Sequence, residues 1–235
     1  MGRVRMAALP VVYFILLASL GTAGEPAEAL VDMFAPDSAK TVAWTAFSEA
    51  EGIRLEDVWR IGPDEIVCLG TPRGYLRTQQ DFTDFILRLE WRWPEGKPGK
   101  GGVLIRTTGP DKIWPKSLEA QINAGEAGDF WGLDGFALRG PSDRMKTVES
   151  ELFGRLTNLK KTAAAERAPG EWNTYEIVAT GGVVTLRING ELVNETTGCD
   201  TVPGKICLTA EGNEIHFRNV RIKVLKQQTR LSSGR

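Results

Sequence analysis

The clearest signal of secondary structure in the chain is FILRLEWRW, at residues 85–93. Its odd positions, from Phe85 to Trp93, are all apolar, whereas most of its even positions are charged. Because successive side chains of a strand point to opposite faces, this alternation predicts a long β-strand. One face of the strand should lie in a core and the other in water or in a groove.

Similar alternating runs continue along the chain. Turn residues separate them, and Asn189-Gly190 is the strongest hairpin signal. No regular alternation of strands with helices indicates a parallel sheet. We therefore predict an antiparallel β-sandwich. The further runs are at residues 59–61, 65–69, 102–106, 118–123, 173–179, 183–188, 206–210 and 215–225.

The last run changes its apolar phase between Phe217 and Val220. A bulge near Arg218 would reconcile the two phases, and bulges re-aim side chains beside sites. A strand that crosses from one neighbour to another would explain the phase change equally well.

One segment does not alternate. Between Ser142 and Lys161 the apolar residues fall three or four positions apart, at 145, 148, 152, 156 and 159. This spacing predicts an inserted amphipathic helix near 142–161, with Ser142 as its N-cap. The helix would lie on the sandwich, or it could form a lid over a groove.

The first residues have the pattern of a secretory signal. Arg3 and Arg5 precede an apolar run over residues 6–23, and small residues follow before Glu25. An uncleaved membrane anchor is the alternative, but Pro10 and the small-residue end favour cleavage. We expect a signal peptide over 1–24, a single domain over 25–235 and a secreted or periplasmic bacterial protein.

Composition excludes several function classes. The chain has 235 residues, with 29 Lys and Arg against 30 Asp and Glu, so no basic field attracts nucleic acid. A single His excludes a multi-His metal site and makes a His-based triad nearly impossible. The three Cys form no CxxC pair; Cys199 and Cys207 could bridge, or all three could be core residues.

Polar side chains are expected to gather on one sheet face. Glu90, Arg106, Glu119 and Gln121 each alternate with apolar neighbours on three successive runs. If these runs share a sheet, the groups form a cluster able to bind sugar hydroxyls. A solvated face of salt bridges is the competing interpretation. Trp131 is a candidate stacking platform for a sugar ring.

Seven motifs in order resemble one family. Together they cover roughly residues 32–225 and resemble the 3-keto-disaccharide hydrolase domain family, also described as 3-keto-glucoside 1,2-lyase or 3-keto-2-hydroxy-glucal hydratase. The motifs are FTDFILRLEWR at 82–92, GVLIR at 102–106, LEAQI at 118–122, GEWNTYEI at 170–177, ING at 188–190, GKICL at 204–208 and FRNVRI at 217–222.

The resemblance implies a concanavalin A-like jelly roll with a carbohydrate-handling concave face. It implies cleavage of a 3-keto-glycoside by base-catalysed elimination and hydration. Glu119 would be the base, and Arg106 or a bound divalent cation would stabilise the enolate. Substrate-binding residues would be Gln121, Glu90, Trp131 and Arg218. The resemblance identifies no definite cofactor; a divalent cation is the one candidate.

Two other functions stay open. The family's usual Gln and His are absent from the run at 208–212. A non-catalytic carbohydrate-binding module of the same fold is therefore the main alternative, and a structural wall or matrix protein is the other. The sequence does not determine the sugar or the oligomeric state.

Overall fold

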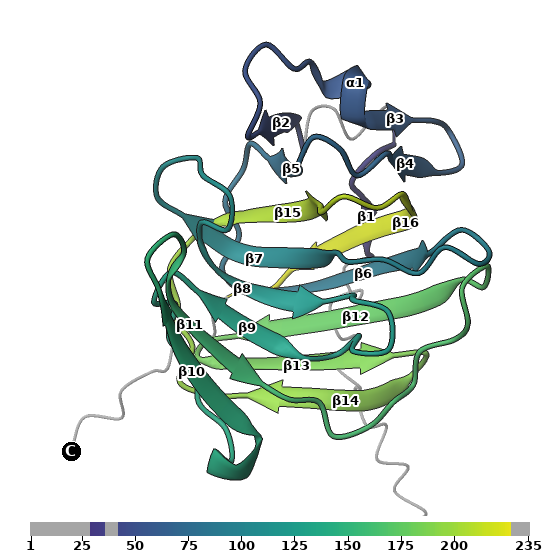
Figure 1. Ribbon diagram of the computed structural model, residues 1–235. Helices are drawn as coiled ribbons and strands as arrows, with labels where there is room; N and C mark the ends of the chain where they lie inside the picture. The colour runs from purple at the N-terminus through teal and green to yellow at the C-terminus, as the bar shows by residue number, and fades with distance from the viewer. Residues whose placement is uncertain (1–28, 36–41, 227–235) are drawn as a thin grey trace, which may run out of the picture.

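The computed structural model describes residues 29–35 and 42–226. It confirms the predicted fold: two eight-stranded antiparallel sheets face each other in a concanavalin A-like sandwich (Figure 1). The expected signal peptide over 1–24 lies outside the described residues. Within the described ranges, no helix has the length and hydropathy of a membrane span.

The first sheet, sheet A, has the strand order β14-β13-β12-β6-β16-β4-β3, and β1 pairs with β16. Its strands are β1 (Val31–Asp32), β3 (Trp59–Ile61), β4 (Ile66–Cys68), β6 (Phe85–Arg92), β12 (Asn173–Thr180), β13 (Val183–Ile188), β14 (Glu191–Thr196) and β16 (Ile215–Val224). The one α-helix of the described residues is the short α1 (Leu55–Val58).

The second sheet, sheet B, has the order β10-β11-β9-β8-β7-β15-β5-β2. Its strands are β2 (Trp44–Ser48), β5 (Gly74–Thr78), β7 (Gly102–Thr108), β8 (Lys116–Gln121), β9 (Phe130–Leu133), β10 (Met145–Ser150), β11 (Gly154–Leu159) and β15 (Lys205–Ala210).

The core lies between the two sheets. In β6, Phe85, Leu87, Leu89 and Trp91 are all buried, as the alternation predicts. Burying side chains of this size contributes about 1.5–3 kcal/mol each to folding. In sheet B, Val103 of β7 belongs to the same apolar cluster. The charged residues that alternate with the buried ones in β6, Arg88, Glu90 and Arg92, therefore face outward.

The predicted bulge and hairpin are both present. The register of β16 against β6 shifts between Arg218 and Arg221, and Asn219 has a φ of 52°. Asn189 and Gly190 have φ values of 51° and 85° and join β13 to β14. Two successive positive φ angles are the requirement of a type I′ hairpin turn.

The predicted helix over 142–161 is wrong. The segment begins with a single 3₁₀ turn, η2 (Ser142–Arg144), and continues as the β10–β11 hairpin at the edge of sheet B (Figure 1). Met145 pairs with Leu159 and Val148 with Leu156 across this hairpin. The apolar positions are thus mirror-symmetric about Leu152 at the tip. That symmetry reproduces helical spacing by coincidence.

All three cysteines are buried and free. Burial raises the pKa of the Cys68 and Cys207 thiols to about 12 and that of Cys199 to about 11. The sequence left a Cys199–Cys207 bridge open; the structure has none.

Candidate active site

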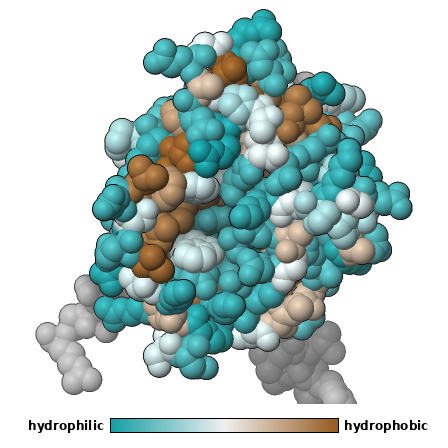
Figure 2. All heavy atoms as spheres, viewed as in Figure 1, coloured by the Kyte–Doolittle hydropathy of each residue, from teal (hydrophilic) through white to brown (hydrophobic). Residues whose placement is uncertain are grey.

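A pocket of about 400 Å³ lies on the outer face of sheet B. Figure 2 shows this face, with a recess near its middle and hydrophobic residues along one rim. The strands under the pocket, β9, β8, β7 and β15, are neighbours in this sheet. The residues that line it are Arg73, Lys100, Trp114, Glu119, Gln121, Asn123, Trp131, Leu133, Phe153, Leu156 and Glu211.

Two carboxyl groups share this pocket. Glu119 is on β8, where its cross-strand partners are Leu104 and Trp131, and only 4% of its surface is exposed. Glu211 directly follows β15. Burial, and after it the negative charge of Glu211, raises the pKa of Glu119 well above its ordinary value.

Glu211 is better supported as an anion. Burial also raises its pKa, but a hydrogen bond from Thr209, the charges of Lys100 and Arg73, and a hydrogen bond from Trp114 oppose the shift. The causes that act on Glu119 all raise its pKa. Of the two carboxyl groups, Glu211 is therefore the one whose charge is stabilised by neighbouring groups.

The approach to β7 makes room for this arrangement. The Glu119 side chain lies over Gly102, and a β-carbon there would come within 2.4 Å of Oε1 of Glu119. Thr209 Oγ1 accepts a hydrogen bond from the Gly102 nitrogen at 2.6 Å. The nitrogen of Gly101 donates to Oδ1 of Asn123 at 3.0 Å. These bonds fix the backbone under the carboxyl pair.

One side of the pocket is apolar. Phe153, at the end of the β10–β11 turn, packs edge-on against Trp114 with 4.5 Å between ring centroids. Trp131 and Leu133 of β9 and Leu156 of β11 continue this wall.

Two buried polar atoms of pocket-lining residues have no hydrogen-bond partner within the protein. They are Nε1 of Trp131 and Oε1 of Glu211. Buried polar atoms are almost always paired, so orphans of this kind mark a place where a ligand or water supplies the partner.

Three of the six predicted site residues come together. Glu119, Gln121 and Trp131 all line the pocket. Alternation with buried apolar residues on β8 predicted the outward position of Glu119 and Gln121, whereas Trp131 was proposed only as a stacking platform.

Arg106 is not part of the pocket. Its side chain is fully buried, and it donates to the carbonyl oxygens of Thr83 at 2.9 Å and Asp200 at 2.8 Å. Its Nη2 lies 3.3 Å from a carboxylate oxygen of Asp84. A positive φ of 51° interrupts the pleat at Arg106, and the β7–β8 register shifts there. We therefore correct the assignment: Arg106 ties β7 to two loops and does not face a substrate.

Glu90 and Arg218 lie on the other sheet. Glu90 accepts hydrogen bonds from Arg218 at 2.7 Å and from Asn219 at 2.8 Å on the outer face of sheet A. The expectation that 85–92 shares a sheet with 102–106 and 118–123 is wrong, because the chain crosses between sheets after β6. A single surface cluster is therefore excluded.

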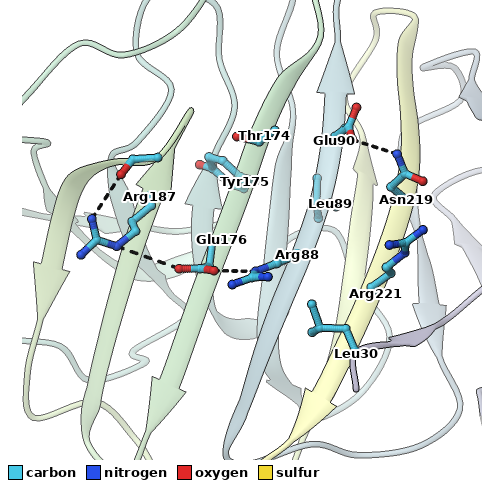
Figure 3. Close-up of a pocket in the computed structure, with 11 residues that line it drawn as sticks. Leu30, Arg88, Leu89, Glu90, Thr174, Tyr175, Glu176, Arg187, Asn219 and Arg221 are labelled. Carbon is cyan, nitrogen blue, oxygen red and sulfur yellow. Dashed lines mark hydrogen bonds and ion pairs between the residues drawn. The ribbon is translucent and has the colours of Figure 1, made fainter. Parts of the chain in front are cut away.

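A second hollow, of about 290 Å³, lies on that face of sheet A (Figure 3). Glu176 accepts a hydrogen bond from Arg88 at 2.5 Å and lies 3.9 Å from Arg187. This is the solvated, ion-paired sheet face that was the competing interpretation. The lone His216 belongs to the same face, between Glu65 and Glu214.

The sequence analysis missed Glu211, Lys100, Arg73 and Phe153. A signal existed for Glu211, because Cys207, Thr209 and Glu211 alternate with buried apolar residues and so share the outward phase. No local pattern indicates the others, which come from loops. Among the described residues, no three His, Cys, Asp or Glu side chains are grouped to hold a metal ion.

Comparisons with known proteins agree with this fold. A proposed glycosyl hydrolase from Parabacteroides distasonis is 18% identical, with a TM-score of 0.57 over 84% of this chain and 100% of that chain. The carbohydrate-binding module CBM66 from Bacillus subtilis is 14% identical, with a TM-score of 0.54 over 77% and 94%. A Bacillus licheniformis β-glucanase is 12% identical, with a TM-score of 0.53 over 83% and 97%.

No curated protein matches the chain in sequence. The profile of the 3-keto-alpha-glucoside-1,2-lyase-like domain matches residues 31–223, which is nearly the whole described sandwich. The chain therefore belongs to the family of 3-keto-alpha-glucoside-1,2-lyase-like domains.

Proposed function

We propose that the protein cleaves 3-keto-glycosides by elimination and hydration in the pocket of sheet B. The observation that carries this proposal is the Glu119–Glu211 pair: two carboxyl groups line a single pocket, and neighbouring groups stabilise the charge of Glu211 but not that of Glu119. Two carboxyl groups with separated pKa values are a general acid and a general base. Family membership supports the same reaction class.

In the elimination step, the Glu211 carboxylate takes the proton from carbon 2. The C2–H electron pair first forms an enolate with the ketone at carbon 3. The enolate then re-forms the ketone, the C1=C2 double bond appears, and the glycosidic C1–O bond breaks. Glu119 gives its proton to the leaving oxygen. After this step Glu211 carries a proton and Glu119 carries the negative charge.

Hydration restores the pair. Water adds its hydroxyl to carbon 1 and releases a proton to the Glu119 carboxylate. Glu211 returns the first proton to carbon 2. Lys100 is the cation for the enolate oxygen, because Arg73 is held by Glu49 at 2.9 Å. This assignment replaces the expected base, Glu119, and the expected cation, Arg106.

The test is to measure release of the leaving group, which reports elimination without hydration, from two 3-keto-glucosides, one with a nitrophenyl and one with an alkyl leaving group. A nitrophenolate needs no proton to leave. Glu119→Gln should therefore lose the alkyl substrate by about a hundredfold or more and retain most activity on the nitrophenyl one. Glu211→Gln should lose both. Glu176→Gln, on the far sheet, is the matched control and should keep both activities.

A carbohydrate-binding module remains the second candidate. The aromatic rings of Trp114 and Trp131 in the pocket favour it, because sugar rings stack on such surfaces. Binding of a 3-keto-glucoside by the wild-type protein without any product would favour the module. Neither binding nor turnover would instead favour a structural wall protein.

We also propose that the protein is exported. The support is the pattern of residues 1–24, with charged, apolar and small-residue parts in the order of a secretory signal. Expression in a bacterium, followed by fractionation and amino-terminal sequencing, should give a mature chain that starts near Glu25. An intact amino terminus in the membrane fraction would show an anchor instead.

A further inference from the structure

The pocket of sheet B is divided into a polar and an apolar half by the order of the strands. The polar half comes from β8 and from the loops beside β7, β15 and β5, which supply Glu119, Gln121, Lys100, Glu211 and Arg73. The apolar half comes from β9 and β11, on the other side of β8, and from the hairpin turn. It consists of Leu133, Phe153, Leu156 and the ring of Trp131, whose Nε1 is the one hydrogen-bond donor among these four side chains.

Trp114 lies at the boundary between the two halves. Its ring packs against Phe153 on the apolar side. On the polar side, the guanidinium of Arg73 lies 5.9 Å from the ring centroid, and Trp114 contributes a hydrogen bond that stabilises the Glu211 carboxylate. A molecule that fills the pocket therefore meets hydrogen-bonding groups at one end and an apolar wall at the other.

We infer that the substrate is a glycoside whose leaving group is an apolar ring. This inference rests on the proposed function, which places the oxidised sugar at the carboxyl pair. The leaving group then extends over β9 toward the hairpin, where Leu133, Leu156 and Phe153 present no hydrogen-bonding side chain.

A second sugar would be a poor occupant of the apolar half. Most of its hydroxyl groups would lose water there without gaining a partner, and desolvated polar groups without partners are costly. An aromatic or alicyclic ring gains free energy from the same burial. The volume of about 400 Å³ is near the lower end for ligand pockets, which suits one sugar and one further ring.

The turn of the β10–β11 hairpin supplies one residue of this apolar half, Phe153. Phe153 turns inward onto Trp114, whereas its neighbour Leu152 is 79% exposed and does not line the pocket. The two residues therefore offer a matched pair of substitutions at one turn. Phe153→Ser changes the apolar wall, and Leu152→Ser changes only the exposed tip.

The experiment compares three 3-keto-glucosides with methyl, cyclohexyl and inositol leaving groups, by calorimetric binding and by turnover. Cyclohexyl and inositol have the same ring and differ in hydroxylation, and both need a proton from Glu119 in order to leave as alcohols. We expect the cyclohexyl compound to bind at least about tenfold more tightly than the inositol compound. Phe153→Ser and Leu156→Thr should reduce that ratio severalfold, and Leu152→Ser should not.

Equal or tighter binding of the inositol compound by the wild-type protein would overturn the inference. The wild-type ratio decides the question even if a pocket variant fails to fold. Turnover of the methyl compound without a cyclohexyl preference would refute this inference and leave the proposed function intact. A cyclohexyl preference without turnover of any compound would refute the lyase proposal and support the apolar half.

Discussion

The carboxylate of Glu119 occupies the space that a side chain at Gly102 would need. A β-carbon on residue 102 would lie 2.4 Å from Oε1 of Glu119 and 2.8 Å from its Cγ. The two residues are on the adjacent strands β8 and β7, so the pocket floor is open only where β7 carries a glycine. The position of the carboxyl pair thus depends on a residue that has no side chain.

Gly102→Ala should therefore displace the Glu119 carboxylate and lower turnover of a 3-keto-glucoside. A misplacement of about 1 Å in a catalytic group can cost a hundredfold in rate. Gly101→Ala is the matched control, because a β-carbon there meets its nearest atom, on Trp93, at an ordinary 3.5 Å. Steady-state kinetics of both variants should show a large loss for Gly102→Ala alone, and equal losses would contradict this account.

The free energy of unfolding of Glu119→Gln, minus that of the wild type, should increase as the pH rises. The folded-state pKa of Glu119 lies above its ordinary value of 4.5, so above pH 4.5 the folded protein holds a proton that the unfolded chain has released. The contribution of Glu119 to wild-type stability then falls as the pH rises from 4.5 to the folded-state pKa, by up to about 1.4 kcal/mol per pH unit. Denaturant unfolding at several pH values measures the difference. A constant difference between variant and wild type would mean that the carboxyl group is not perturbed.

Arg106→Met should destabilise the protein without removing a catalytic group. The substitution removes the guanidinium from the Asp84 carboxylate, which keeps a hydrogen bond from the Gly181 nitrogen at 2.9 Å, and from the carbonyl oxygens of Thr83 and Asp200. Losing one partner of a buried ion pair costs about 3–5 kcal/mol. Thermal denaturation should show a large decrease in Tm, whereas Arg88→Met, at a side chain that is 56% exposed, should show almost none. A folded Arg106→Met protein that has lost all turnover would restore the expected catalytic role.

The three thiols should not react in the folded protein. All are buried, and the raised pKa of each, at about 11 or 12, keeps the reactive thiolate scarce at pH 8. A colorimetric disulfide reagent should detect no thiol in the native state and three thiols in denaturant. Fewer than three in denaturant would indicate that some of the cysteines had been oxidised.

Local patterns predicted much of the fold, because a strand that buries one face carries apolar residues at every second position. The runs at 59–61 and 183–188 match β3 and β13 in full. The bulge near Arg218 followed from a change of phase. The hairpin at 145–159 was misread as a helix, because its mirror symmetry about Leu152 mimics a spacing of three and four.

Alternation along the predicted runs indicated which side chains face the core and which face outward, and it failed at Arg106, where a positive φ interrupts the pleat. It put Glu119 and Gln121 on an outer surface, where they line one pocket together with Trp131. The sheet that each strand joins follows from long-range pairing, which no local pattern records. The crossing after β6 separates Glu119 from Glu90, and the return crossing after β15 brings Arg218 to the side of Glu90. The pairing of Glu119 with Glu211 also comes from strand order, because β7 alone separates β8 from β15 although the two residues are far apart in the chain. Alternation records the face of a strand and carries no information about its neighbours.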